Sequence, residues 1–310
     1  KRLWDRGIKP LVLLRGYRGK VKTPLLVSDG VDILAKPPLA GDEAYLLATK
    51  LPGVPVVTGA DRYLAGSWAF SRFHPDVFLL DDGFQHWKLY RDLDIVLLDG
   101  RNPFGYGHLL PRGLLREPPE ALGRADLVAI TTDHPDFAQG RPQGFEELLA
   151  SLRRYHPKAP IILRRLPRPF LALSDGREAC DELGRVVGLS ALKGKKALAF
   201  SGIGNPSSFE AHLRRLGVEV LEHRVFPDHH RYRLQELRIL AETAKKKGAE
   251  VLLTTEKDMV RIPPWPSAIP LFALRIELEV IEGEQELEQV VEQLICPPQR
   301  RYGERREHLL

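Results

Sequence analysis

Short apolar runs without polar alternation are the feature that most constrains how this chain can fold. Five of them are expected to form strands: Leu11–Leu14, Val54–Val57, Val77–Leu80, Asp94–Leu98 and Leu127–Ile130. Strands that are apolar on both faces are typical of a parallel sheet covered by helices on both sides. Ala44, Leu47 and Leu51 recur at helical spacing between two of these runs. The pattern therefore predicts an α/β fold assembled from βαβ units around a parallel sheet.

A second α/β pattern begins after residue 190. Its expected strands and helices are Lys196–Phe200, Phe209–Leu216, Val218–Leu221, Leu234–Lys247, Glu250–Leu253 and a late helix over Glu284–Leu294. The stretch before it contains four prolines and the turn signal Ser174-Asp175-Gly176, which indicates a linker with a β-hairpin. We predict a core domain over residues 1–160, a linker over 161–190, a smaller α/β domain over 191–283, and a C-terminal helix with a basic tail over 284–310.

Composition excludes several classes of protein. The 310 residues contain 46 Lys and Arg against 41 Asp and Glu, and the net charge of +5 favours an anionic partner. Only two cysteines are present, which excludes a disulfide framework and a zinc-finger spacing. No apolar run approaches 18 residues, so no membrane span is expected. No nucleic-acid-binding module is visible.

The densest polar cluster is the segment DDGFQH at residues 81–86, directly after an apolar strand. In open α/β sheets, ligands bind at the carboxyl ends of the strands. Adjacent carboxylates such as Asp81 and Asp82 are hard oxygen ligands that suit Mg²⁺, with a nucleotide phosphate completing its shell. A turn in which an Asp caps the next element is the structural alternative.

Five further clusters could carry chemistry. Gly41-Asp42-Glu43 stands at an expected helix start, where Asp could serve only as the helix cap. In the segment FPDHH at 226–230, an Asp beside a His suits proton transfer, although a polar loop explains it equally well. The segment RGYRG at 15–19 could bind phosphate or be a basic loop. The loops at 201–206 and 254–258 could also face a site. No GxxxxGK[ST] phosphate-binding loop occurs.

Seven segments taken together resemble the tetraacyldisaccharide 4'-kinase family, the lipid A 4'-kinases of Gram-negative bacteria. They are RGYRG, GDEAYLLA, DRYLAG, DDGFQH, NPFGYGHLLPRGLLREP, FPDHHRY and TTEKDMVRI, in this order between Arg15 and Arg261. The resemblance implies a P-loop-kinase-like fold and transfer of phosphate from ATP, with Mg²⁺, to the 4'-hydroxyl of the lipid A disaccharide 1-phosphate. It also implies action at the cytoplasmic face of the inner membrane. The oligomeric state is open in the sequence, and a monomer is the default expectation.

The resemblance implies a role for ten residues. Asp42 is expected to be the base that takes the hydroxyl proton, and His229 its partner from the second domain, with the choice over His230 resting on the family pattern. Glu43, Asp81 and Asp82 are expected to hold the metal. The residues expected to hold the disaccharide and its phosphate are Arg15, Tyr17, Arg62, His86 and Glu117. One catalytic residue from each domain further implies closure over the substrate, which would exclude water.

The family also carries a phosphate-binding loop in a segment that would precede Lys1. The sequence starts at Lys1 and its only methionine is Met259. We therefore expect an N-terminally truncated kinase and little or no turnover by residues 1–310 alone, which an assay with ATP and the disaccharide 1-phosphate would test.

Two alternatives belong to other functional classes. A metal-dependent phosphohydrolase could use Asp81, Asp82 and His229, and it would release phosphate from a model ester without nucleotide. A non-enzymatic anion-binding module could hold a glycolipid through its basic surface, and its binding would be insensitive to Asp42→Ala.

Overall fold

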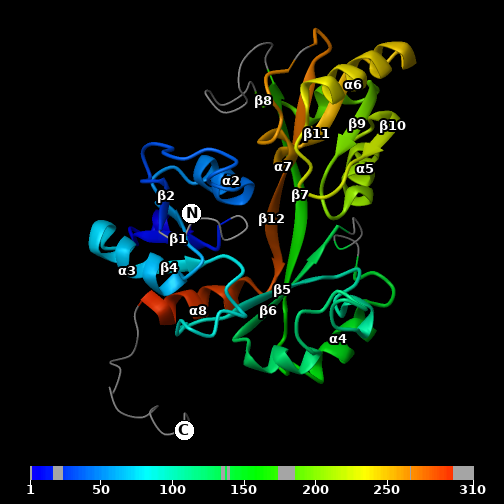
Figure 1. Ribbon diagram of the computed structural model, residues 1–310. Helices are drawn as coiled ribbons and strands as arrows, with labels where there is room; N and C mark the ends of the chain where they lie inside the picture. Colours follow the sequence, from blue (N-terminus) through cyan, green and yellow to red (C-terminus); the bar gives the residue numbers. More distant parts are fainter. Residues whose placement is uncertain are drawn as a thin grey trace, which may run out of the picture. The chain divides into compact units, whose positions relative to one another are not determined.

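The computed structural model describes residues 2–16, 24–133, 137, 140–173, 186–265 and 267–295 (Figure 1). The chain forms two compact units, each assembled from two separate stretches of sequence. The first comprises Lys1–Leu89 and Leu166–Glu277, and the second comprises Tyr90–Arg165 and Leu278–Leu310. The domains expected from the sequence differ from these units, because each expected domain is one continuous stretch of the chain. Their boundaries at 160, 190 and 283 stay a prediction.

The N-terminal stretch of the first unit folds around a four-stranded sheet with the order β2-β3-β1-β4. Its elements are α1 (Arg2–Asp5), β1 (Pro10–Leu14), β2 (Leu25–Ser28), α2 (Asp42–Lys50), β3 (Val56–Thr58), α3 (Arg62–Phe73) and β4 (Val77–Leu80). Strand β1 pairs in parallel with β3 and β4, as the apolar runs predict. Strand β2 pairs antiparallel with β3 at the edge and is not among the expected strands.

Helices cover both faces of this sheet. Alternate residues of β1 belong to two different buried clusters, one with Ala44 and Tyr45 of α2 and the other with Ala65 and Ala69 of α3. Successive side chains of a strand point to opposite faces, so a strand covered on both sides is apolar throughout. Burying each large apolar side chain contributes roughly 1.5–3 kcal/mol, which makes this packing the main source of local stability.

The second stretch of the first unit contributes strands in the order β10-β9-β11-β12-β7 to an eight-stranded sheet, which continues through β6 and β5. Its elements are β7 (Ile161–Leu173), β8 (Val186–Val187), the 3-10 helix Leu189–Leu192, β9 (Lys196–Ser201), α5 (Pro206–Arg215), β10 (Glu219–Val225), α6 (Leu234–Lys247), β11 (Val251–Thr255), α7 (Glu256–Met259) and β12 (Leu271–Glu282). Strands β9 to β12 pair in parallel. Strand β8 pairs antiparallel with β7, in agreement with the expected hairpin.

Strand β9 has the same two-sided burial as β1. Ala197 and Ala199 share a buried cluster with Phe209 and Leu213 of α5, whereas Leu198 and Phe200 pack in a second cluster with residues of α6. Helix α6 has the bounds that its periodicity predicts, and Gly248 ends it in the left-handed conformation with φ 71°. The parallel α/β fold expected from the sequence is confirmed in both sheets of this unit.

The second unit is smaller. Strands β7 and β12 each begin in one unit and end in the other, and β7 pairs here in parallel with β6 and β6 with β5. Its other elements are β5 (Ile95–Asp99), the 3-10 helices Gly105–Gly107 and Pro119–Arg124, β6 (Leu127–Thr132), α4 (Phe145–Arg153) and α8 (Glu284–Ile295). Leu287 and Val290 of α8 pack against a cluster of Leu127, Ala129 and Ile161. Among the helices that the structure describes, none is long and apolar enough to cross a bilayer.

Candidate active site

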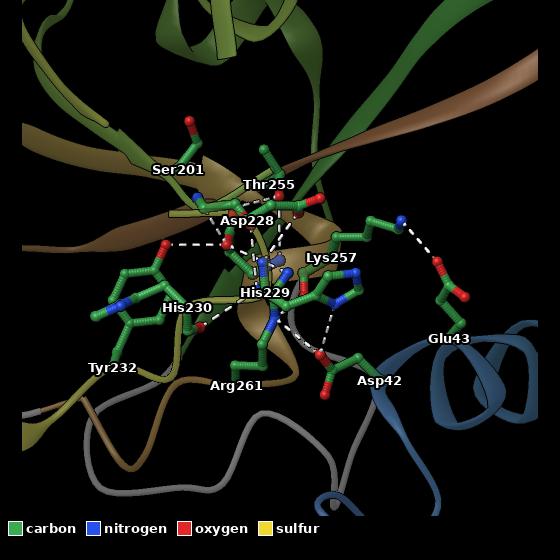
Figure 2. A network of polar contacts seen from close by, with 12 residues as sticks. Asp42, Glu43, Ser201, Asp228, His229, His230, Tyr232, Thr255, Lys257 and Arg261 are labelled. Carbon is green, nitrogen blue, oxygen red and sulfur yellow. Dashed lines mark hydrogen bonds and ion pairs between the residues drawn. The ribbon is translucent and has the colours of Figure 1, made fainter. Parts of the chain in front are cut away.

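Asp42 is the first residue of α2. Gly41 caps this helix with φ 81° and ψ 153°, and no side chain forms a cap hydrogen bond. Asp42 is therefore not the cap, and it lies with Glu43 in the acidic first turn of the helix. Its carboxylate is 11% exposed and contacts two groups from the second stretch of the same unit. Oδ2 lies 3.4 Å from Nδ1 of His229 and 3.3 Å from Nε of Arg261 (Figure 2).

His229 lies in the loop after β10 in a conformation that few side chains adopt. Its φ is 58°, in the left-handed region, where a non-glycine residue is uncommon. Two hydrogen bonds hold the backbone there, because its N–H donates to Asp228 Oδ1 at 2.9 Å and to the carbonyl of Gly202 at 3.1 Å. This loop geometry directs the imidazole toward Asp42 (Figure 2).

His230 makes different contacts, although it is the next residue. Its ring stacks on Phe226 at 4.6 Å between centroids, and Nε2 lies 3.1 Å from Oε2 of Glu236. Tyr232 packs edge-on against the same ring at 5.0 Å. His230 is thus engaged in the packing of the loop, and His229 is the histidine that reaches Asp42.

Asp81 and Asp82 follow β4 in a tight turn. Asp82 has φ 52°, and a side chain at Gly83 would place its Cβ 2.9 Å from Cβ of Leu80, so the turn requires glycine. The side chain of Asp81 stays accessible to solvent, but the protein around it removes part of its hydration. This loss of hydration, followed by the charges of Glu43 and Asp82, raises the pKa of Asp81. Three carboxylates from α2 and the β4 turn therefore lie close enough to repel one another.

These carboxylates offer oxygen ligands for a cation. Within the described ranges, no group of three or more His, Cys, Asp or Glu side chains is close enough to hold a metal ion by itself. Carboxylate oxygens are nonetheless the donors that Mg²⁺ prefers, and Mg²⁺ in nucleotide sites takes only one or two carboxylates and completes its shell with phosphates and water. The mutual repulsion at Asp81 marks a place where a cation is stabilising, so the donor set fits.

A lysine ammonium already lies beside this group of acids. Nζ of Lys257, from α7, is 3.0 Å from Oε1 of Glu43 (Figure 2). The charge of Lys257 also acts on Asp81, where it opposes the raised pKa. The segment at 254–258 therefore faces the site, as its position after a strand suggested.

Two arginines lie within electrostatic range of the acidic pair. Asp61 caps α3 by accepting from two backbone amides, which leaves Arg62 as the first helical residue, only 5% exposed. Burial and the like charge of Arg15 lower the pKa of Arg62, while Asp82 and Asp81 oppose this shift. Arg62 Nη1 donates to the carbonyl of Ala60 at 3.3 Å, and no described residue accepts a hydrogen bond from Nε. The structure thus brings Arg15, Arg62 and the acidic pair into electrostatic range of one another.

The remaining expected substrate residues are distributed differently. His86 closes the turn of the acidic pair, where its backbone N–H donates to the carbonyl of Gly83 at 2.9 Å. Glu117 belongs to the second unit and forms a two-pronged ion pair with Arg124 at 3.0 and 2.8 Å. Tyr17 lies outside the described residues. Within the first unit, the structure thus brings Arg15 and Arg62 near the acidic pair, and Glu117 pairs with Arg124 within the second unit.

Arg261 and Asp258 are polar residues to which the sequence assigned no role, although Asp258 ends the loop at 254–258 that was expected to face a site. The side chain of Arg261 is 2% exposed and that of Asp258 is fully buried, and the two lie 3.5 Å apart. Their spacing of three residues, at the end of a strand and over a short helix, is the only local signal for the pair. Contacts of Arg261 with residues far along the chain are not visible in a single sequence.

Comparison with known proteins identifies the family. The family model of tetraacyldisaccharide-1-P 4'-kinase matches residues 1–296. A tetraacyldisaccharide 4'-kinase of Syntrophus aciditrophicus is 44% identical over 282 residues, covering 90% of this chain and 74% of that protein. One from Anaeromyxobacter sp. (strain Fw109-5) is 43% identical over 289 residues, covering 93% of this chain and 74% of that protein.

A solved structure agrees with these matches. A crystal structure of "apo" form LpxK from Aquifex aeolicus in complex with ATP superposes with a TM-score of 0.69 at 30% identity, covering 95% of this chain and 82% of that one. The resemblance carried by the seven sequence segments is confirmed. The chain belongs to the tetraacyldisaccharide-1-phosphate 4'-kinase family.

Proposed function

We propose that the protein to which this chain belongs catalyses the ATP-dependent phosphorylation of the 4'-hydroxyl of the tetraacyldisaccharide 1-phosphate precursor of lipid A. The observation that carries the proposal is the contact of Asp42 with His229, 187 residues apart in the sequence and 3.4 Å apart in space, beside a group of carboxylates. The names of the relatives support the reaction, and they disfavour a phosphohydrolase and a non-enzymatic binding module.

Asp42 acts as the general base in this proposal. Its Oδ2 faces the Nδ1 of His229 and the Nε of Arg261. Oδ1 takes the proton of the 4'-hydroxyl while that oxygen forms its bond to the γ-phosphorus of ATP. The bond from the γ-phosphorus to the β,γ-bridging oxygen breaks, and the products are the 4'-phosphate and ADP.

His229 compensates for the weak basicity of the carboxylate. An aspartate has an ordinary pKa near 4, well below neutral pH, so a lone carboxylate holds a hydroxyl proton poorly. The imidazole of His229 lies 3.4 Å from Oδ2 of Asp42, so it can hydrogen-bond to the carboxylate and share the acquired proton. The contact is already formed within one compact unit, and the expected closure over the substrate stays a prediction.

Glu43, Asp81 and Asp82 would hold Mg²⁺, which when bound neutralises charge on the transferred phosphoryl group. The repulsion that raises the pKa of Asp81 supports this assignment, because a cation relieves it. Lys257 places a further positive charge next to Glu43.

Arginines and polar side chains bind the acceptor in this proposal. Arg62 has a buried Nε–H for which no described residue is an acceptor, and this supports a phosphate or sugar oxygen as its ligand. Arg15, Tyr17, His86 and Glu117 complete the acceptor site. Because the acceptor is a glycolipid and ATP is cytoplasmic, we place the protein at the cytoplasmic face of the inner membrane, as a monomer.

The test is phosphate transfer by the gene product that contains this chain. Radiolabelled ATP and the disaccharide 1-phosphate should give a 4'-phosphorylated glycolipid, and Asp42→Asn should lower kcat by about 10²–10⁴-fold. The matched control is Arg214→Gln, which removes an exposed ion pair of α5 and should leave transfer unchanged. Phosphate release from a model ester without nucleotide would favour the phosphohydrolase instead. Glycolipid binding without any transfer would favour the binding module.

A further inference from the structure

We infer that Arg261 is a positioning residue, which fixes Asp42 and His229 in one geometry and leaves one oxygen of Asp42 directed at the acceptor hydroxyl. The inference rests on the proposed function and deepens it. It assigns a role to the end of the segment TTEKDMVRI, which is far from Asp42 in the sequence.

Backbone carbonyls hold the guanidinium of Arg261 on one side. Nη1 donates to the carbonyl of Gly202 at 3.2 Å and to that of His230 at 3.3 Å, and Nε donates to the carbonyl of Lys257 at 3.3 Å. The N–H groups of a planar guanidinium point in fixed directions, so hydrogen bonds to several acceptors restrict the conformation of the side chain. Since the side chain is 2% exposed, water does not compete for these contacts.

Asp258 supplies the buried counter-charge, and it is itself fixed. Its Oδ1 accepts from the backbone N–H of Gly202 at 3.0 Å and from Tyr232 Oη at 2.9 Å. Its Oδ2 accepts from Thr255 Oγ1 at 2.6 Å, and Arg261 Nη2 lies 3.5 Å from Oδ1. A fully buried carboxylate with this many donors is a rigid anchor for the arginine.

The Nε edge of the guanidinium faces Asp42. Nε of Arg261, which donates to the carbonyl of Lys257, also lies 3.3 Å from the oxygen of Asp42 that faces His229, as an ion pair (Figure 2). Both contacts fall on Oδ2. A carboxylate with one oxygen held by two partners has its second oxygen in a defined direction.

The same arginine also fixes the histidine. The carbonyl of Gly202 accepts from Nη1 of Arg261 and from the backbone N–H of His229, at 3.2 and 3.1 Å. The carbonyl of His230, which Nη1 also reaches, belongs to the neighbouring residue of the loop. One guanidinium thus ties together both members of the proposed pair, whose positions in the sequence are far apart.

The experiment compares Arg261→Gln and Arg261→Lys, each in the wild-type and in the Asp42→Asn background, with Arg214→Gln as the matched control. In the wild-type background Arg261→Gln should lower kcat by about 30–100-fold, with KM for ATP and for the acceptor within about 3-fold, because misplacing a base acts on the transition state. Arg261→Lys keeps the charge but not the fork, and it should be intermediate. In the Asp42→Asn background Arg261→Gln should cost less than about 3-fold, since the residue acts through Asp42.

If Arg261→Gln lowers kcat as much in the Asp42→Asn background as in the wild-type background, the inference is overturned. A wild-type kcat for both Arg261→Gln and Arg261→Lys would also overturn it. If Arg261→Gln does not fold, Tyr232→Phe takes its place, because it removes one hydrogen bond to Asp258 and keeps the ring that packs against Phe200. Tyr232→Phe should lower kcat by about 3-fold or more in the wild-type background only, and an unchanged kcat counts against the inference. A wild-type protein without transfer activity refutes the proposed function and this inference with it, whereas an active wild type with unaffected variants refutes the inference alone.

Discussion

Removal of the buried carboxylate of Asp258 should be among the most destabilising changes in the first unit. Asp258→Ala leaves three hydrogen-bond donors without their acceptor: the hydroxyl groups of Tyr232 and Thr255 and the backbone N–H of Gly202. Each buried donor without an acceptor lowers the free energy of unfolding by about 1–3 kcal/mol. The substitution also removes a counter-charge next to the buried Arg261, and breaking a buried ion pair costs about 3–5 kcal/mol.

These costs overlap, because water can enter the space left by the carboxylate and Arg261 keeps Asp42 and three carbonyls as partners. We therefore expect a loss of about 3–5 kcal/mol in the free energy of unfolding rather than the sum. Urea unfolding followed by tryptophan fluorescence measures it, since Trp265 is 2% exposed and lies in the same buried cluster as Tyr232.

The matched control is Glu277→Ala, which removes a half-exposed acid paired with Arg168 at 2.7 Å. An exposed ion pair contributes at most about 1 kcal/mol, so the control should unfold close to the wild type. A loss of less than about 1 kcal/mol for Asp258→Ala would refute the argument that this network is buried and fully bonded.

Other substitutions test separate parts of the structure. The raised pKa of Asp81 means that the stabilising contribution of this group is present at low pH and is lost as pH rises through its pKa in the folded state. Asp81→Asn should therefore raise Tm at neutral pH without metal, and this gain should vanish in acid, below about pH 4; a lower Tm at neutral pH would contradict the assignment. Lys257→Met removes an exposed ion pair with Glu43 and should change stability by less than about 1 kcal/mol in a denaturant titration; a loss above about 2 kcal/mol would show that the pair is desolvated. Leu213→Ala, at a side chain with no exposed surface, should cost about 2–5 kcal/mol in the same titration, and a loss below about 1 kcal/mol would contradict its place in the core.

The sequence predicts the buried strands well and the exposed elements poorly. Two-sided burial makes β1 and β9 continuous apolar runs, which stand out without any structure. Strand β12 alternates apolar residues with Arg275, Glu277 and Glu279 over much of its length, so it lacks that signal. Helix α3 buries the small residues Ala65 and Ala69, while larger apolar residues of the helix are exposed. The apolar pattern of the sequence therefore does not indicate which face of the helix is buried.

The site shows a similar division. Asp42, His229 and the acidic pair stand in segments whose chemistry is visible in the sequence, and the first two are found in contact. The contact of Arg261 with Asp42 could not be predicted, because nothing local to either residue records a partner more than 200 residues away. Lys257 beside Glu43 is a second case, in which the sequence indicated a site-facing loop but not its partner.

The most direct test of the proposed catalytic pair is a double-mutant cycle on kcat with Asp42→Asn and His229→Asn. Asparagine tolerates the left-handed backbone that His229 adopts, so this substitution removes the imidazole without straining the loop. If the two side chains act as one unit, each single substitution should lower kcat by at least about 10²-fold. The kcat of the double variant should then be within about 3-fold of that of the less active single variant. Losses that multiply in the double variant, or a single variant with wild-type kcat, would contradict the pairing of Asp42 with His229.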